Sequence, residues 1–183
     1  MSHPTAGRRA LAVSLAIAAV VVALDQGTKQ WALSALDDRI IDVVWTLQFN
    51  LAFNSGMAFG RGQGWGPVIG VVATIVVVGL LVSLRNENSR LSTVAIGLIV
   101  GGALGNILDR LFRGDGILHG SVVDFIDFQW FPIFNVADIA INVGGGLMIL
   151  GFVLASRRST ESSESNGTSE PNVSDVSNDG AGS

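Results

Sequence analysis

Twenty consecutive residues, from Trp65 to Leu84, carry no charged side chain. As an α-helix they would span about 30 Å, which is the thickness of the hydrocarbon core of a bilayer. The whole chain has the same character, because 49% of its 183 residues are hydrophobic and only 14% are charged. Since a typical soluble domain carries about 25% charged residues, the sequence indicates a membrane protein.

Three further apolar segments are long enough to cross a bilayer, at about residues 10–35, 91–110 and 131–155. The sequence therefore predicts a membrane all-α fold with four transmembrane helices, the uncharged run at about 65–84 being the second. The first segment could instead be a secretory signal peptide, because a basic pair precedes it. Residues 22–24 do not form a small-x-small cleavage site, however, and helix-compatible sequence continues beyond them. We therefore favour a helix.

Basic residues predict the orientation of the four spans. Six of them flank the span ends that would share one side with both termini: Arg8, Arg9, Arg85, Arg90, Arg157 and Arg158. The positive-inside rule makes this side cytoplasmic. We expect residues 1–9 to be a cytoplasmic N-terminus and residues 10–158 to form the membrane domain. Residues 159–183, which hold five acids and no Lys or Arg, are expected to form a disordered acidic cytoplasmic tail.

Two short segments alternate between apolar and polar residues, at 45–54 and 122–128. Alternation with a period of two is typical of a β-strand with one apolar face. A strand cannot cross a bilayer alone, because its backbone groups would lack partners in hydrocarbon. We therefore expect a small extracytoplasmic β-sheet or loop region at the outer interface, with the apolar face of 45–54 towards lipid. Residues 54–60 are mostly small, which allows either close backbone approach to a ligand or a plain hairpin turn.

Two aspartates lie at the outer ends of the apolar segments, where ionisable groups are expensive and indicate function. Asp124 follows the third span in a loop, and Asp138 lies 14 residues later, just inside the fourth span. Two neighbouring carboxylates can share one proton and serve as base and acid in peptide hydrolysis. A proton relay in a transporter would use the same pair, and the residues alone leave both interpretations open.

Other polar residues and glycines recur at helical spacing. Asp25 and Lys29 are four residues apart, which fits either an ordinary ion pair or a pair that orients an active site. Gly101 and Gly105 have the GxxxG spacing that lets helices pack closely. Three polar residues form one stripe in the first half of the fourth span, namely Asn135, Asp138 and Asn142.

The composition argues against several other kinds of site. The chain contains no cysteine, so disulfides, thiolate metal sites and a cysteine nucleophile are excluded. His119 lies in a loop without a cluster of further ligands, so we expect no metal and no other cofactor. Without its acidic tail the chain is nearly neutral, so it offers no basic face to nucleic acid.

Taken together, five motifs resemble those of bacterial lipoprotein signal peptidase (signal peptidase II). In order they are Asp25-x-x-x-Lys29, Asn54-Ser55-Gly56-Met57-Ala58-Phe59, the segment from Gly101 to Arg110, Val122-Val123-Asp124-Phe125, and Phe134-Asn135-Val136-Ala137-Asp138. The resemblance covers about residues 8–158 and includes the four-span topology. It implies an aspartyl endopeptidase of the bacterial cytoplasmic membrane, which removes signal peptides from diacylglyceryl-modified prolipoproteins by cutting before the lipidated cysteine.

The resemblance also implies roles for individual residues. Asp124 and Asp138 would be the catalytic pair, at the extracytoplasmic face. Residues that would position the substrate or this pair are Asp25, Lys29, Asn54, Gly56, Asn106, Arg110 and Asn135. The expected partners are prolipoproteins and membrane phospholipid, and we expect a monomer. The alternatives are a small proton-coupled transporter, although the chain lacks the internal repeats usual in transporters, and a non-enzymatic lipid-binding or assembly protein.

Overall fold

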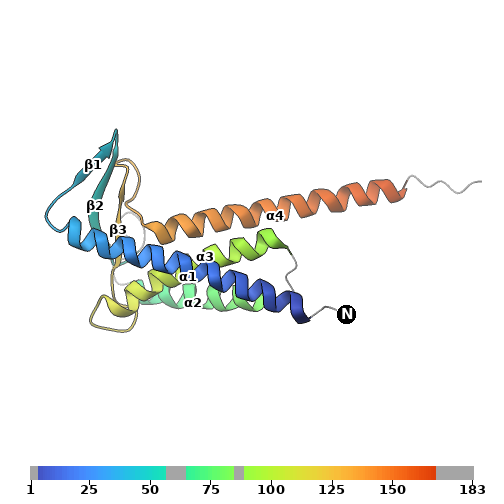
Figure 1. The fold of residues 1–183 in the computed structure, drawn as a ribbon, viewed down its shortest axis with the longest axis horizontal. Helices are drawn as coiled ribbons and strands as arrows, with labels where there is room; N and C mark the ends of the chain where they lie inside the picture. Colours follow the sequence, from blue (N-terminus) through green and yellow to red (C-terminus); the bar gives the residue numbers. More distant parts are fainter. Residues whose placement is uncertain (1–3, 57–64, 85–88, 168–183) are drawn as a thin grey trace, which may run out of the picture.

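Four long helices and a three-stranded antiparallel sheet are present in the computed structural model, which describes residues 4–56, 65–84 and 89–167 (Figure 1). In chain order the elements are α1 (Pro4–Ala35), β1 (Ile41–Val44), β2 (Leu47–Asn54), α2 (Gly66–Ser83), α3 (Arg90–Phe112), β3 (Val122–Asp127) and α4 (Val136–Gly167). The predicted run of small residues at 54–60 is described only as far as Gly56.

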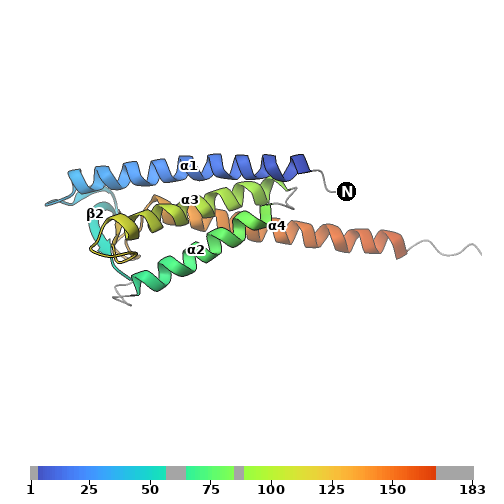
Figure 2. The same cartoon turned by 90° about the horizontal axis from the view of Figure 1, so that it is seen from below.

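The helices run along the long axis of the molecule, and the sheet lies at one end of the bundle (Figures 1 and 2). Each helix contains a segment that is long and apolar enough to cross a membrane: Gly7–Ala35, Gly66–Ser83, Arg90–Phe112 and Val136–Arg157. Large aliphatic side chains such as Ile75 on α2 and Ile149 on α4 point outward and are exposed. An apolar surface of this extent requires lipid around it. The predicted membrane all-α fold with a small sheet at one end is confirmed.

α3 packs against all three other helices, and glycine residues allow the close approach. A Cβ atom on Gly101 would lie 2.7–2.9 Å from atoms of α1, and one on Gly105 would lie 2.5 Å from a carboxylate oxygen of Asp25. On the side that faces α4, a Cβ atom on Gly102 would overlap the carbonyl oxygen of Ala137. The predicted packing role of Gly101 and Gly105 is therefore confirmed.

The sheet has the order β1-β2-β3 with antiparallel pairing. The predicted strand 45–54 begins only at Leu47, because Trp45 and Thr46 form the turn of a hairpin with β1, a strand that was not predicted. Trp45 has a φ angle of 53°, in the left-handed region that favours glycine. A tryptophan at this position hides the usual sequence signal of a hairpin turn. The second alternating segment forms β3, as predicted.

The middle of the apolar side of β2 packs within the protein, so the prediction that this side faces lipid is wrong for Phe49 and Leu51. Trp45 and Phe53, towards the two ends of the same side, are exposed. The ring of Phe49 lies 5.2 Å from that of Trp31 and 6.3 Å from that of Phe125, measured between centroids. Leu51 packs with them against the buried Ala32 near the end of α1. Aromatic packing of this kind fixes the sheet to the end of α1.

α4 begins at Val136, later than the predicted start at residue 131, and Asn135 precedes the helix instead of lying inside it. Its side-chain oxygen accepts a hydrogen bond from the backbone N–H of Asp138 at 3.0 Å. In return, the Asp138 carboxylate accepts one from the backbone N–H of Asn135 at 3.2 Å. This reciprocal capping box defines the first turn of α4.

The far end of α4 continues to Gly167, so the prediction that a disordered tail starts at residue 159 is wrong for residues 159–167. Residues 168–183 lie outside the described residues, so disorder there stays a prediction. The start of α1 and the end of α4 lie at the same end of the bundle, away from the sheet (Figure 1). An even number of spans requires this arrangement.

We predict that Gly105→Ala destabilises the protein, because the new methyl group would lie 2.5 Å from the Asp25 carboxylate in a tightly packed interface. Overpacking of this kind costs about 1–3 kcal/mol. The matched control is Gly146→Ala on α4, whose new Cβ atom has no neighbour within 4 Å. Thermal unfolding in detergent should show a lower midpoint only for Gly105→Ala. Equal midpoints for the two variants would contradict the close packing of α1 on α3.

Candidate active site

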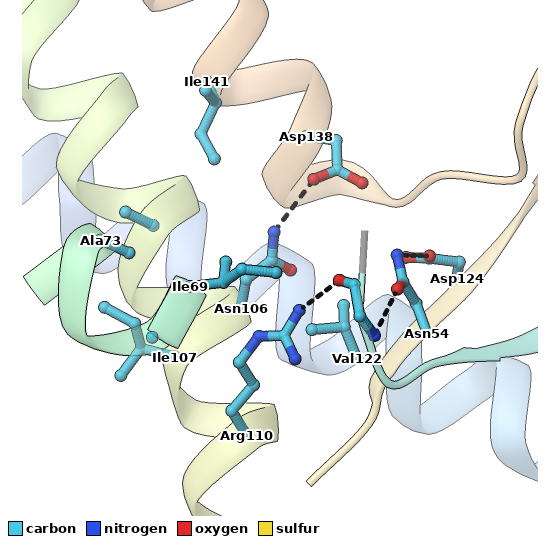
Figure 3. A pocket seen from close by; sticks show the side chains of 13 residues that line it. Asn54, Ile69, Ala73, Asn106, Ile107, Arg110, Val122, Asp124, Asp138 and Ile141 are labelled. Carbon is cyan, nitrogen blue, oxygen red and sulfur yellow. Dashed lines mark hydrogen bonds between the residues drawn. The ribbon is translucent and has the colours of Figure 1, made fainter. Parts of the chain in front are cut away.

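A pocket of about 360 Å³ lies at the sheet end of the bundle, between α2, α3, α4 and the sheet (Figure 3). Its polar lining residues are Asn54, Asn106, Arg110, Asp124 and Asp138. The rest of the wall is formed by small and aliphatic residues, which are Gly56, Ile69, Gly70, Ala73, Ala103, Ile107, Val122 and Ile141. An apolar cavity with a few converging polar groups is typical of a site that binds a small ligand or part of a larger one.

Asp124 on β3 is 3% exposed, and both of its carboxylate oxygens accept hydrogen bonds from asparagine side chains. The Nδ2 of Asn135 donates to Oδ1 at 2.6 Å. The Nδ2 of Asn54, at the end of β2, donates to Oδ2 at 3.2 Å. The carboxylate is therefore fixed from two sides, by α4's cap residue and by the neighbouring strand.

Asp138 in the first turn of α4 is held in a comparable way. Its Oδ1 accepts a hydrogen bond from Nδ2 of Asn106 on α3 at 2.9 Å (Figure 3). Its Oδ2 accepts from the backbone N–H of Asn135 at 3.2 Å. Asn135 thus contacts Asp124 through its side chain and Asp138 through its backbone, so that one residue fixes the two carboxylates relative to each other.

The environment of Asp124 changes its acidity. Burial raises the pKa of Asp124 from 3.8 to about 7, and the nearby charge of Asp138 acts in the same direction. Hydrogen bonds from Asn135 and Asn54 stabilise the ionised form and limit the rise. A carboxyl group with a pKa near 7 can hold or release a proton at neutral pH, as general acid–base chemistry requires.

Lys29 lies behind the pocket wall and is fully buried. Its Nζ lies 2.8 Å from carboxylate oxygens of both Asp25 and Asp109, and it donates to Oδ1 of Asn106 at 2.9 Å. These three oxygens match the three N–H donors of an ammonium group. Because the Asn106 oxygen is used in this way, its NH₂ group is directed to Asp138. The Asp25–Lys29 pair is therefore not an ordinary surface ion pair.

Asp109 is a site residue that was not predicted from the sequence. Besides Lys29, it contacts Arg113 at 2.8 Å and accepts a hydrogen bond from the backbone N–H of Val123 on β3 at 3.1 Å. It thereby connects α1, α3 and the strand that carries Asp124. A signal was available, because Asp109 lies three residues after Asn106, on the same face of a helix.

Arg110 lines the pocket, and its guanidinium group is only partly paired. Its Nη2 donates to the carbonyl oxygen of Gly56 at 3.1 Å, and the backbone N–H of Gly56 donates to the side chain of Asn54 at 3.1 Å. Its Nη1 is buried and has no hydrogen-bond partner among the described residues. A buried donor without a partner is costly, so this nitrogen is available to an acceptor that enters the pocket.

The structure thus brings all nine predicted site residues to one end of the bundle. Asp124, Asp138, Asn54, Gly56, Asn106 and Arg110 line the pocket. Asn135 bridges the two carboxylates, and Asp25 and Lys29 lie one layer behind them.

Comparison with known proteins gives a consistent result. Residues 17–154 match the family model described as signal peptidase (SPase) II. Proteins named lipoprotein signal peptidase from Mycolicibacterium smegmatis, Mycobacterium avium and Streptomyces coelicolor are 40%, 41% and 39% identical to this chain. These matches cover 82%, 78% and 80% of this chain, and 65%, 79% and 72% of the respective relatives.

Two solved structures have a similar fold, and both are described as a bacterial membrane enzyme. The first has a TM-score of 0.68 and 31% sequence identity, over 78% of this chain and 88% of the other. The second has a TM-score of 0.64 and 32% identity, over 76% of this chain and 91% of the other.

We predict that the protein becomes less stable as the pH rises, because the folded protein holds a proton on Asp124. Between its ordinary pKa of 3.8 and its raised pKa of about 7, the folded protein keeps a proton that the unfolded chain has lost. The stabilising contribution of this proton is complete below the lower value and is lost as the pH rises to the upper one. Thermal midpoints in detergent, measured from about pH 4 to about pH 7, should decrease less in Asp124→Asn than in the unchanged protein.

The control for this measurement is Asp127→Asn, three residues along the same strand. Burial alone would raise the pKa of Asp127, but hydrogen bonds from Asn50, Gln48 and Gln129 lower it overall. Its contribution to stability is therefore complete above its ordinary pKa of 3.8 and is lost as the pH falls below this value, so Asp127→Asn should show the same slope as the unchanged protein between about pH 4 and about pH 7. Identical slopes for the unchanged protein and Asp124→Asn would show that Asp124 does not carry the raised pKa.

Proposed function

Because the chain belongs to the signal peptidase II family, whose members are membrane peptidases, we propose that it removes signal peptides from diacylglyceryl-modified prolipoproteins. The cut would fall directly before the lipidated cysteine. The observation that carries this proposal is the pair of carboxylates, Asp124 and Asp138, which face one pocket and are both hydrogen-bonded to Asn135.

The proposed chemistry uses the two carboxyl groups with one proton between them. The ionised group takes a proton from a water molecule, whose oxygen then attacks the scissile carbonyl carbon. The protonated group donates its proton to the nitrogen of the leaving amide as the C–N bond breaks. Close carboxylates share a proton because both cannot ionise cheaply, and the pair rather than either residue sets the pH profile.

The balance of charges at this end of the bundle supports a singly protonated pair. Four acids and three bases lie in or directly behind the pocket: Asp25, Asp109, Asp124, Asp138, Lys29, Arg110 and Arg113. One proton on the pair leaves three negative and three positive charges. Because an uncompensated buried charge is strongly destabilising, neutrality favours this protonation state.

The remaining polar residues would position the substrate or the pair. The unpaired Nη1 of Arg110 can donate a hydrogen bond to a backbone carbonyl oxygen of a bound peptide. Gly56 would present its backbone beside that peptide, and Asn54 would hold Asp124. Asp25 and Lys29 act through Asn106, which donates to Asp138.

The membrane setting suits a substrate that is itself anchored in lipid. We propose that the sheet end of the bundle is extracytoplasmic and that both termini are cytoplasmic, from the basic pairs that flank the span ends at the opposite end. A lipid-modified prolipoprotein would then reach the pocket laterally from the bilayer. We propose that the protein works as a monomer without a cofactor.

The experiment that tests this function is cleavage of a diacylglyceryl-modified prolipoprotein by the purified protein in detergent, beside the same substrate without the lipid. We expect cleavage of the lipidated form only. Loss of general acid–base catalysis reduces a rate by about 10²–10⁴-fold, so Asp124→Asn and Asp138→Asn should each reduce cleavage at least this strongly. Asp127→Asn should cleave at the unchanged rate, because Asp127 bonds to Gln48 and Asn50 instead of facing the pocket.

Cleavage of both substrate forms at equal rates would contradict the proposed substrate class. Normal cleavage by a folded Asp124→Asn or Asp138→Asn variant would contradict the proposed catalytic pair.

A second prediction separates the positioning role of Asn54 from a purely structural one. Asn54→Ala removes a hydrogen bond that stabilises ionised Asp124, so the pKa of Asp124 should rise further. One net hydrogen bond corresponds to about one pH unit, and the pH profile of kcat/KM should move upward by about this amount. The matched control is Asn50→Ala, because Asn50 lies on the same strand but donates to Asp127 at 3.1 Å. Equal pH profiles for the two variants would contradict the role of Asn54.

A further inference from the structure

The turn of the β1–β2 hairpin exposes a continuous apolar segment. Val43, Val44 and Trp45 are 47%, 58% and 100% exposed. Trp45 also has the left-handed φ angle described above, which glycine or asparagine adopts more easily. The tryptophan therefore neither favours the turn nor packs against the protein. Strained, fully exposed residues of this kind point to a contact outside the chain.

A second exposed aromatic segment lies beside this turn. Pairing of Gln48 with Asp127 places the residues after β3 next to the hairpin end, and Gln129 donates a hydrogen bond to Gln48 at 3.3 Å. In this loop Trp130 is 74% exposed and Phe131 is about half exposed. We name the combined surface the aromatic edge, which consists of Val43, Val44, Trp45, Trp130 and Phe131.

The aromatic edge is continuous with the lipid-facing surface of the bundle. The hairpin runs across the direction of the helices and projects sideways from their ends, on the side where α4 lies (Figure 1). Phe131 stands just before α4, whose outward residues Ile139 and Val143 are exposed within a membrane span. A segment that projects sideways from the ends of membrane-spanning helices lies over the surrounding bilayer. Tryptophan is enriched at the membrane–water interface, because its ring is apolar and its N–H is polar.

We propose that the aromatic edge docks into the interfacial region of the bilayer, beside α4, with phospholipid as its occupant. The contact holds the hairpin at a fixed depth. Because β2 pairs with β3 at Ala52 and Asp124, it also fixes the depth of the strand that carries Asp124. The inference does not depend on peptide cleavage, since lipid contact can be measured without substrate.

The test is depth-dependent quenching of tryptophan fluorescence in the full chain. Trp31→Phe, Trp65→Phe and Trp130→Phe together leave Trp45 as the only tryptophan. The variant is reconstituted into phosphatidylcholine vesicles whose acyl chains carry bromine either near the glycerol or near the terminal methyl group. We expect strong quenching of Trp45 by the shallow label, at least twofold more than by the deep label.

A matched control places the reporter on a polar part of the same membrane face. In a background in which all four tryptophans are replaced by phenylalanine, Asp38→Trp puts the ring in the exposed turn after α1. We expect this reporter to be quenched weakly by either label. A parallel variant that retains only Trp130 gives a second, independent reading of the edge and should behave like the Trp45 variant.

Quenching of Trp45 no stronger than that of the Asp38→Trp reporter would overturn the proposal. Stronger quenching by the deep label would also overturn it, because the edge would then lie among the acyl chains. If Trp45 escapes both labels and its emission instead shifts with protein concentration, a second copy of the chain covers the edge and phospholipid does not.

Discussion

The arrangement of the pocket depends on a single buried ammonium group. Lys29 of α1 is surrounded by oxygens of Asp25, Asp109 and Asn106, so that each of its three N–H donors has an acceptor. A buried charge of this kind is tolerated only when its partners are in place, because removal of either aspartate takes away a compensating charge and removal of Asn106 leaves a buried N–H donor without an acceptor. The requirement extends to α4, because the Asn106 side chain that faces Lys29 also faces Asp138. The position of one lysine thus constrains three helices.

Close helix packing is the condition for this network. Because Gly105 has no side chain, the carboxylate of Asp25 can lie against the backbone of α3. In the same position Asp25 accepts a hydrogen bond from the backbone N–H of Ala137 at 3.0 Å, at the start of α4. Interactions between polar groups on different helices are favoured by small residues at membrane helix interfaces, where backbones can approach. The glycines and the buried charges therefore form one structural unit.

Hydropathy and charge predicted the architecture because the bilayer imposes both. Because span length follows from bilayer thickness, most helix ends were predicted to within a few residues. The capping box, which sets the start of α4 at Val136, depends on local hydrogen bonds that periodicity does not detect. Alternation likewise showed that 45–54 has one apolar face, but could not show that α1 covers much of it.

The polar end of the bundle was only partly predictable. Asp124 and Asp138 were identified because acids at span ends are rare and expensive. Asp109 is also an acid at a span end, but its role depends on Lys29, which lies on another helix and far away in the sequence. Its neighbour Arg110 points elsewhere, since successive helical residues diverge by about 100°.

Asp138 belongs both to the proposed catalytic pair and to the capping box of α4. Many active-site residues are retained at a cost in stability, so that their replacement stabilises the protein. At Asp138, activity and stability favour the same side chain, because a carboxylate is stabilised at the positive N-terminal end of a helix dipole. Selection for a stable helix start would then preserve the side chain even in a lineage that had lost the activity. For an inactive form intended to retain bound substrate, Asp124 is the better position to change.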